Sequence, residues 1–337
     1  MARTSQENHV VVTGGAGYIG AALVPELLEA GHRVTVLDRF LFGEGPLDSV
    51  RHHPALDLVA GDIRNPETVR SVLSRDVWAV IHLAAISNDP SAELAPEVTR
   101  SVNGQGTELV MTQAKEEGVS RFLYASSASV YGIKDTADVT EDLPMEPITL
   151  YAECKAEGEK TLNRLVNDSF VGVSVRAATV CGDSPRLRLD LTINLLTDQA
   201  LRMGWIRVFG GSQMRPNIHL GDLTAFYRQL LEAAPERING RAFNVCRRNS
   251  SVAGLAEMIR DEIDPDLEIR TEPTDDLRSY HLSGQSAEKE LGFVPRRELV
   301  EAVRELRHRY RTPQDPPPED AWYRNVRWMK DHPERWK

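Results

Sequence analysis

Short apolar runs alternate with amphipathic stretches through the first half of the chain. Runs rich in β-branched residues predict strands at residues 9–13, 33–37, 56–60, 79–83, 121–125 and 171–176. Between them, apolar residues at helical spacing predict helices at 21–30 (closed by Gly31), 66–74 and 107–117. Strands that alternate with helices pair in parallel through right-handed crossovers. The expected fold class is therefore α/β, a Rossmann doubly wound parallel sheet.

The second half is less regular and predicts a smaller C-terminal substrate-binding lobe. Helices are expected at 187–203, 222–233 (with Asp222 as N-cap), 252–263 and 297–309, and a strand at 206–209. The resulting division is a Rossmann domain at 8–180 with returning segments at about 216–250, a lobe at 181–215 and 251–311, and a proline-rich linker and tryptophan-rich tail at 312–337. We expect Trp322, Trp328 and Trp336 to dock on the protein's own body or on a second subunit.

Composition narrows the class of partner. The 337 residues carry a net charge of −10, which argues against nucleic acid because phosphate backbones need a basic surface. No apolar run is long enough for a membrane span, and the polar N-terminus does not resemble a signal peptide. The cysteines Cys154, Cys181 and Cys246 lack metal-ligand spacing and predict reduced thiols in a cytoplasmic protein. We expect no metal site.

A glycine-rich turn follows the first predicted strand. Gly14, Gly17 and Gly20 lie between that strand and a helix expected to start near Tyr18, which is the context of a dinucleotide-binding turn. Glycines let the backbone approach a pyrophosphate, and the helix offers free N–H groups and the positive end of its dipole. Asp38 ends the second strand, where a carboxylate accepts bonds from ribose hydroxyls and favours NAD. Its neighbour Arg39 leaves NADP open, because a guanidinium can hold a 2′-phosphate.

A candidate catalytic pair lies on a later helix. Tyr151 and Lys155 are spaced i and i+4, so they share one helix face. A free phenol has a pKa of about 10, and lowering it to about 7 costs roughly 4 kcal/mol. The Lys155 ammonium and a positively charged nicotinamide could supply that together. The small hydroxyl residues of segment 122–132 end a predicted strand at the sheet edge where α/β proteins bind ligands.

These residues together carry a family resemblance. The chain resembles an extended short-chain dehydrogenase/reductase of the sugar-nucleotide epimerase/dehydratase type, similar to UDP-glucose 4-epimerases. The matching segments span most of the chain, in the order that the family requires: TGGAGYIG (13–20), GDI (61–63), HLAA (82–85), Asn103 in SVNGQGT, SSASVYG (126–132), YAECK (151–155) and RPNIHLGDL (215–223).

The resemblance implies roles for individual residues. Tyr151 would take the proton of a sugar hydroxyl that Ser127 also binds, while hydride passes to NAD, and Lys155 would bond the nicotinamide ribose. The candidate cofactor contacts are Gly14, Gly17, Tyr18, Ile19, Gly20, Asp38, Arg39, Asp62, Ile63, Leu83, Ala84, Ala85, Asn103, Tyr151 and Lys155. The candidate contacts to a nucleotide-sugar substrate are Ser87, Asn88, Ser127, Ser129, Thr179, Arg186, Arg188, Arg215 and Arg278.

Departures from the family pattern leave the reaction open. A 4,6-dehydratase would carry an Asp-Glu pair where this chain has Ala128 and Ser129, so dehydration by that route is not expected. Thr179 and Cys181 replace the usual asparagine and tyrosine, and Pro273 stands where a phosphate-binding arginine is expected. Arg186, Arg188, Arg270 and Arg278 are the candidate substitutes, and Arg186 and Arg188 are the best placed. His82 and His219 are expected to be structural.

Three functions remain on these residues. The first is a 4-epimerase with tightly held NAD. The second is a dehydrogenase or ketoreductase of a modified nucleotide hexose, and the third is a nucleotide-sensing module without catalysis, which the intact Ser127, Tyr151 and Lys155 argue against. The resemblance also implies a homodimer formed through helices at about 104–117 and 151–167.

Overall fold

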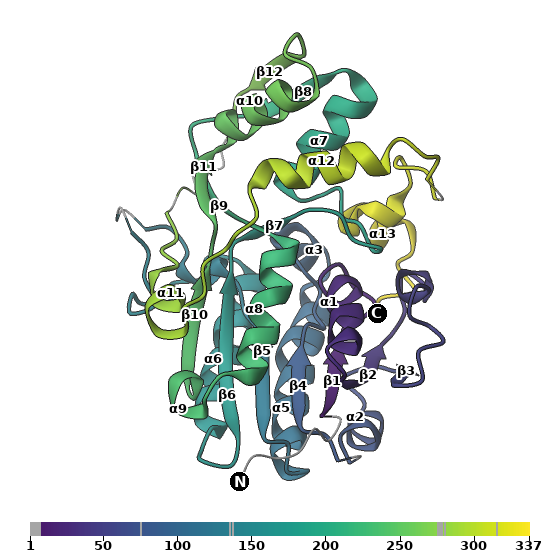
Figure 1. Ribbon diagram of the computed structural model, residues 1–337, viewed down its shortest axis with the longest axis vertical. Helices are drawn as coiled ribbons and strands as arrows, with labels where there is room; N and C mark the ends of the chain where they lie inside the picture. The colour runs from purple at the N-terminus through teal and green to yellow at the C-terminus, as the bar shows by residue number, and fades with distance from the viewer. Residues whose placement is uncertain are drawn as a thin grey trace.

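A seven-stranded parallel sheet forms the centre of the lower body in Figure 1. The computed structural model describes residues 8–74, 76–134, 136, 138–274, 279, 281–314 and 316–337. The sheet has the order β10-β6-β5-β4-β1-β2-β3, so its direction of growth reverses between β1 and β4. Its strands are β1 (His9–Thr13), β2 (Arg33–Asp38), β3 (Leu56–Ala60), β4 (Ala79–His82), β5 (Arg121–Ala125), β6 (Val171–Ala177) and β10 (Arg241–Val245). The Rossmann prediction is confirmed, and the reversal marks the crevice where such folds bind ligands.

Helices cover both faces of this sheet, which is why its central strands are apolar on both sides. In Figure 1, α1 (Gly20–Glu29) and α8 (Leu220–Glu232) lie in front. Behind them lie α2 (Pro66–Leu73), α5 (Thr107–Glu116) and α6 (Leu150–Leu165). Shorter helices complete the layers: α3 (Asp89–Leu94), α4 (Pro96–Thr99), α9 (Pro235–Ile238) and α11 (Gln285–Leu291). All residues of β1 are buried, as this double cover requires.

The smaller upper body lies beyond the carboxyl ends of the main strands (Figure 1). It contains α7 (Thr192–Met203), α10 (Val252–Ile263) and α12 (Leu299–Arg309), packed with the parallel pair β8 (Trp205–Phe209) and β12 (Glu268–Glu272). A three-stranded sheet made of β7 (Thr179–Cys181), β9 (Met214–His219) and β11 (Arg248–Ser251) runs between the two bodies. Ligands bound at the sheet edge therefore face residues of both bodies.

The tail returns from the upper body to the lower one and ends beside β2 and β3 (Figure 1). It forms a short turn, η4 (Ala321–Tyr323), and one helix, α13 (Asn325–Asp331). Trp328 and Trp336 are buried in a cluster with Leu41 and Phe42, which follow β2. The expectation that the tail docks is confirmed, and its partner is the protein's own body.

Three expected helix starts differ in the structure. The helix predicted at 187–203 begins only at Thr192, because Arg188 and Asp190 of the preceding loop turn their side chains to each other and to a cavity at the sheet edge. Helix α1 begins at Gly20, one residue before the expected range 21–30 and two residues after Tyr18. His219, not Asp222, caps α8. The carboxylate of Asp222 instead accepts the N–H groups of Arg296 and Arg297 at 3.0 and 2.9 Å.

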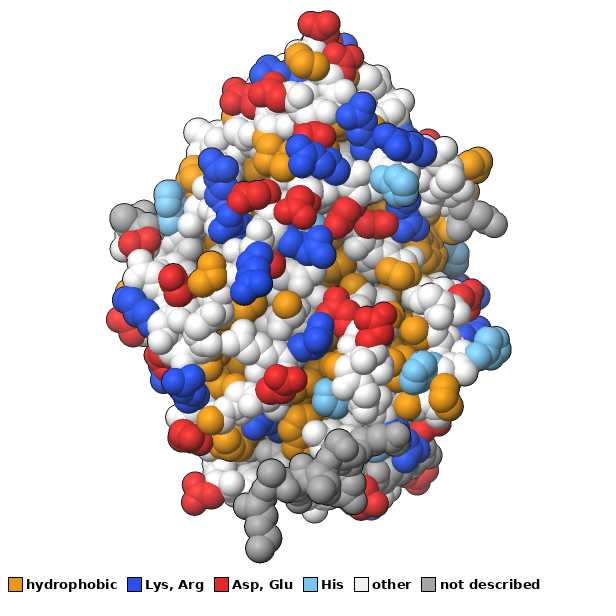
Figure 2. All heavy atoms as spheres, in the orientation of Figure 1, with side chains coloured by type: hydrophobic (Ala, Val, Ile, Leu, Met, Phe, Trp, Pro, Cys, Tyr) orange, Lys and Arg blue, Asp and Glu red, His pale blue; other side chains and the backbone are white. Residues whose placement is uncertain are grey.

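Charged side chains of both signs are interspersed over the face seen in Figure 2. Among the described residues, no helix combines the length and the apolarity needed to cross a membrane.

Candidate active site

A cavity of about 500 Å³ lies along the carboxyl edge of the main sheet, at the β1/β4 reversal. It brings together most of the residues that the sequence singles out. The predicted cofactor contacts on its wall are Gly14, Gly17, Tyr18, Ile19, Gly20, Asp38, Arg39, Asp62, Ile63, Leu83, Ala84, Ala85 and Tyr151. The predicted substrate contacts on its wall are Ser87, Asn88, Ser127, Ser129, Thr179, Arg186, Arg188 and Arg215. One cavity therefore holds both sets.

Two predicted contacts lie behind this wall, and one lies outside the described residues. Lys155 is buried and donates to the Ala125 carbonyl at 2.6 Å. Asn103 uses its amide oxygen and nitrogen to hold the backbone N–H and carbonyl of Ile86, at 2.8 and 2.9 Å. In this structure Asn103 thus braces the loop after β4. Arg278 is the residue outside the described part of the chain.

The glycine turn has no room for side chains. Gly14 has φ +72°, and a Cβ there would lie 2.7 Å from the backbone nitrogen of Ala84. At Gly20 a Cβ would lie 2.5 Å from the Cα of Gly15. Both approaches are closer than carbon atoms tolerate, and backbone atoms cannot move aside as a flexible side chain can. The turn therefore packs against the loop after β4 and leaves its outer surface on the cavity, as a pyrophosphate site requires.

Asp38 closes the far end of the turn. Its carboxylate accepts the N–H of Ala16 at 3.0 Å and that of Phe40 at 2.8 Å. Burial raises the pKa of this carboxyl, and the backbone N–H groups oppose that rise. A carboxylate has about four acceptor positions, so acceptor capacity remains for the two hydroxyls of a ribose. The residues present therefore fit the adenosine half of NAD.

Tyr18 serves the fold with its hydroxyl. That group donates to the Gly182 carbonyl at 2.8 Å and accepts from the amide of Asn194 at 3.2 Å. Burial raises its pKa well above the usual value. The side chain therefore ties the glycine turn to the upper body.

The catalytic candidates meet where α6 begins. Thr149 caps this helix by accepting the N–H of Ala152, which places Tyr151 in the first turn, on the cavity. Tyr151 shares a hydrogen bond with Ser127. Ser127 also accepts from the N–H and the hydroxyl of Ser129, at 3.1 and 2.9 Å. One turn further along α6, the Nζ of Lys155 lies 5.7 Å from the centre of the Tyr151 ring.

Burial sets the protonation of this pair in the protein without a bound cofactor. Burial, helped by the nearby Asp89, raises the pKa of Tyr151 to about 12. Arg188 and the Ser127 hydrogen bond lower it, but they do not outweigh burial. Burial also lowers the pKa of Lys155 to about 8. With the chain's own groups alone the pKa of Tyr151 stays raised, so the predicted lowering would depend on the positive charge of bound NAD as well as on Lys155.

The part of the cavity that holds the predicted substrate contacts is built on the loop between β7 and α7. Arg188 donates to Asp190 at 2.8 Å and to the hydroxyl of Ser87 at 3.1 Å. Asn88 reaches the other oxygen of Asp190 at 3.3 Å. Asn88 has φ +76°, a strained conformation for a residue with a side chain, and such strain is typical of functional loops. These contacts join the loops after β4 and β7.

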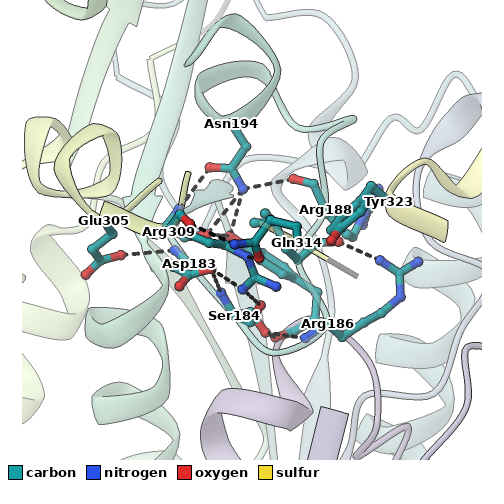
Figure 3. Close-up of polar contacts among 12 residues, drawn as sticks. Asp183, Ser184, Arg186, Arg188, Asn194, Glu305, Arg309, Gln314 and Tyr323 are labelled. Atoms are coloured by element: carbon teal, nitrogen blue, oxygen red, sulfur yellow. Dashed lines mark hydrogen bonds and ion pairs between the residues drawn. The ribbon is translucent and has the colours of Figure 1, made fainter. Parts of the chain in front are cut away.

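Figure 3 shows how the same loop is held from the upper body. Arg309 of α12 donates to the carboxylate of Asp183 at 2.7 Å, and Glu305 accepts the N–H of Asp183 at 3.0 Å. Asn194 of α7 donates to the carbonyl of Arg188 at 2.9 Å. Because several elements fix its backbone, the loop presents the arginine side chains at defined positions.

Arg186 is the most enclosed of the predicted substrate contacts, at 1% exposed. Its guanidinium stacks on Phe42 at 3.6 Å and on Trp322 at 4.7 Å from the ring centres. It donates to the side-chain oxygen of Asn325 at 2.9 Å. Burial lowers its pKa to about 9, so Arg186 stays largely charged at neutral pH.

Two donors on these arginines remain available. Within the described part of the chain, the Nε of Arg186 and one terminal nitrogen of Arg188 are buried without a hydrogen-bond partner. A buried donor left unpaired costs about 1–3 kcal/mol. Both residues line the cavity, so a bound anion or hydroxyl could satisfy these donors.

The sequence did not point to Asp190, Asn325 or Trp336, which also line the cavity. Asn325 donates to Ser87 at 3.1 Å, and its backbone N–H donates to Asp190 at 3.0 Å. The clustered tryptophans indicated that the tail docks, but nothing in them indicated where.

His82 and His219 have structural roles, as expected. His82 is buried between the hydroxyls of Thr13 and Thr107, at 2.8 and 3.1 Å, and burial lowers its pKa to about 3. His219 caps α8 and contacts Glu305 at 3.2 Å. Both hold elements together behind the cavity.

The fold and this cavity define an NAD-binding Rossmann enzyme. Residues 10–246 match the model of the NAD dependent epimerase/dehydratase family, and the chain belongs to that family. Its cofactor is NAD, in agreement with the fit of the glycine turn and Asp38.

Relatives with named activities cover nearly the whole chain. A dTDP-glucose 4,6-dehydratase of Streptomyces griseus is 29% identical over 88% of this chain and 92% of its own. A UDP-glucose 4-epimerase of Mycolicibacterium smegmatis is also 29% identical, over 87% of this chain and 95% of its own. Among solved structures, the dTDP-glucose 4,6-dehydratase DesIV of Streptomyces venezuelae, solved with NAD bound, has a TM-score of 0.78 and 26% identity over 98% of this chain and 100% of its own. The similarity thus includes more than one reaction of the family.

Proposed function

We propose that this enzyme is a nucleotide-sugar 4-epimerase, which oxidises a sugar hydroxyl to a transient ketone and reduces it again on the other face. One observation carries the proposal. Ser127 and Tyr151 are hydrogen-bonded on the wall of the cavity that also contains the glycine turn, and Lys155 lies one helical turn behind them. NAD supplies the hydride acceptor and donor.

In this proposal the chain's own residues move the proton. Ser127 binds the reacting hydroxyl and orients it toward Tyr151. Tyr151 takes the proton during oxidation and returns it during reduction. Such acid–base help is typically worth about 10²–10⁴-fold in rate. The phenolate needs positive charge nearby, because burial and the other protein groups together hold the pKa of Tyr151 at about 12. Lys155 and the cofactor's positive ring would provide it.

The substrate side fits a phosphorylated sugar. Arg186 and Arg188 each offer an unpaired buried donor among the described residues, and Arg215 lies on the same wall. Guanidinium groups suit diphosphate oxygens because they bind two oxygens at once. Ser87, Asn88 and Thr179 would contact the sugar. Asn103 would act by positioning the Ile86 backbone.

Epimerisation is favoured over dehydration by the two residues next to Ser127 in the chain. Ala128 is buried, and the hydroxyl of Ser129 is bonded to Ser127, so neither position supplies a carboxylate at the reacting sugar. Net oxidation or reduction of a nucleotide hexose is the second candidate. It uses the same residues but releases the keto sugar, and the cofactor leaves after each turnover.

Deuterium at C4 of the sugar tests this proposal. UDP-, dTDP-, GDP- and CDP-glucose labelled at C4 would each be incubated with the purified enzyme and followed by NMR. We expect one nucleotide sugar to give its 4-epimer with the deuterium still on C4 and without net NADH. Accumulation of a keto sugar with equimolar NADH, or a requirement for added reduced cofactor, would establish the second candidate instead. A homodimer through α5 and α6 remains a prediction for sedimentation analysis.

A further inference from the structure

The tail segment, defined here as residues 320–337, packs on the loop that follows Asp38. Trp322 donates its indole N–H to the carbonyl of Phe42 at 2.9 Å, and the rings of Trp328 and Phe42 lie 4.7 Å apart. Trp336 is 7% exposed, donates to the Met329 carbonyl at 2.6 Å and lines the cavity. The tail segment is therefore a wall of the cofactor site on the side of β2.

Two arginines beside that wall are held by backbone carbonyls of the tail. Arg39 donates to the carbonyl of Arg335 at 2.7 Å and to that of Trp336 at 3.3 Å, and its Nε lies 3.5 Å from Asp62. Arg64 forms a two-point pair with Asp62 at 2.7 and 3.0 Å and reaches the Lys337 carbonyl at 3.4 Å. Each of the three nitrogens of the Arg39 guanidinium thus faces an acceptor of the protein.

This arrangement bears on the choice between NAD and NADP. An arginine that follows the acidic residue at the end of the second strand is well placed to hold the 2′-phosphate of NADP. Arg39 occupies that position, so the sequence left NADP open. Here three of the five N–H groups of Arg39 are already engaged by the tail carbonyls and Asp62. A 2′-phosphate that binds this guanidinium would have to compete with those acceptors while facing the Asp38 carboxylate.

We propose that the tail segment determines the cofactor preference of this enzyme. Its carbonyls at Arg335 and Trp336 keep Arg39 away from a 2′-phosphate, and Trp336 closes the adenosine end of the cavity so that bound NAD leaves slowly. The inference depends on the NAD site and not on which sugar is epimerised. Slow NAD release would suit an epimerase, which uses one cofactor molecule in both directions.

The test compares cofactor binding by the full chain and by a chain that ends at Asp331. The shortened chain loses both carbonyls and Trp336. We expect its affinity for NADP relative to NAD to rise about tenfold, since charge-assisted hydrogen bonds to the phosphate become possible. Adding Arg39→Ala to the shortened chain should remove that gain. NAD release, followed by stopped-flow fluorescence, should become about tenfold faster.

A control variant and a test of folding separate a specific effect of the tail on cofactor preference from a general loss of structure. Glu334→Ala changes an exposed side chain of the same segment and should leave both affinities as they are. A shortened chain that keeps the thermal unfolding of the full chain but also keeps its NAD-to-NADP ratio would overturn the proposal. If the shortened chain does not fold, Arg39→Ala in the full chain decides instead. We expect its NADP affinity to change less than twofold, and a loss of tenfold or more would show that Arg39 already reaches the phosphate.

Discussion

The two halves of the cavity are formed by different kinds of group: one mainly by backbone, the other by side chains. The cofactor half consists mainly of backbone: a glycine turn pressed against Ala84, and Asp38 held by two N–H groups. The other half, where the substrate contacts are predicted and which we call the substrate half, consists of charged and polar side chains that pair across long stretches of chain. Arg188 and Ser87 are 101 residues apart, Arg186 and Asn325 are 139 apart, and Asn325 and Ser87 are 238 apart. Backbone geometry gives a fixed site for an invariant cofactor, whereas side-chain networks can be altered to suit different sugars.

Tyr151 lies where the two halves meet, so its removal should separate binding from chemistry. Tyr151→Phe removes the proton acceptor and keeps the ring. We expect turnover to fall about 10²–10⁴-fold, with NAD affinity changed less than twofold. Single-turnover kinetics and NAD titration of the same preparation measure both. Unchanged turnover would remove Tyr151 from the mechanism.

The cofactor half should be sensitive to a single added carbon. Gly14→Ala combines a left-handed backbone with a Cβ 2.7 Å from Ala84, and we expect it to cost about 3 kcal/mol of unfolding free energy and most of the NAD affinity. Gly31→Ala is the matched control. It has a similar φ of +82° but no atom within 4 Å of the added Cβ, so only about 1 kcal/mol should be lost. Equal losses in urea unfolding would show that backbone strain, and not the close packing, dominates.

Lowering the pH should reduce the free energy of unfolding through His82, which is buried behind the cavity. Its pKa is lowered to about 3 in the fold, whereas an unfolded histidine has a pKa of about 6.5. Below pH 6.5 the unfolded state therefore binds the proton that the folded state excludes, and stability falls with falling pH until about pH 3. At pH 5 the loss should be about 2 kcal/mol relative to neutral pH. Urea unfolding at both pH values should show a shallower decline for His82→Gln, and a decline of equal slope would count against this assignment.

Replacing Asn325 should weaken binding of the sugar nucleotide without changing the affinity for NAD. Asn325→Ala leaves Arg186 and Ser87 without their partner, and we expect KM for the sugar nucleotide to rise about tenfold while kcat and NAD affinity change little. Lys330→Ala, an exposed position on the same helix, controls for nonspecific effects on the tail. A parallel loss of NAD affinity in Asn325→Ala would mean that the two halves are coupled through the tail.

The amino-acid sequence alone determined the parallel sheet, the glycine turn with Asp38, and the pairing of Tyr151 with Lys155 on one helix face. Each of these depends on neighbouring residues, because strand alternation, positive φ and i,i+4 spacing are local properties. For the same reason the start of α7 was misplaced, since the side chains before Thr192 make contacts with residues far away in the chain.

Tertiary structure alone decided how the substrate half is assembled and where the tail lies. Arg186 was selected as a phosphate contact, but its stacking on Trp322 and its bond to Asn325 depend on a segment that returns after more than a hundred residues. The pKa of Tyr151 was likewise set by burial, which no spacing reveals. Contacts between distant segments depend on how the two bodies pack, and that packing is a property of the whole chain.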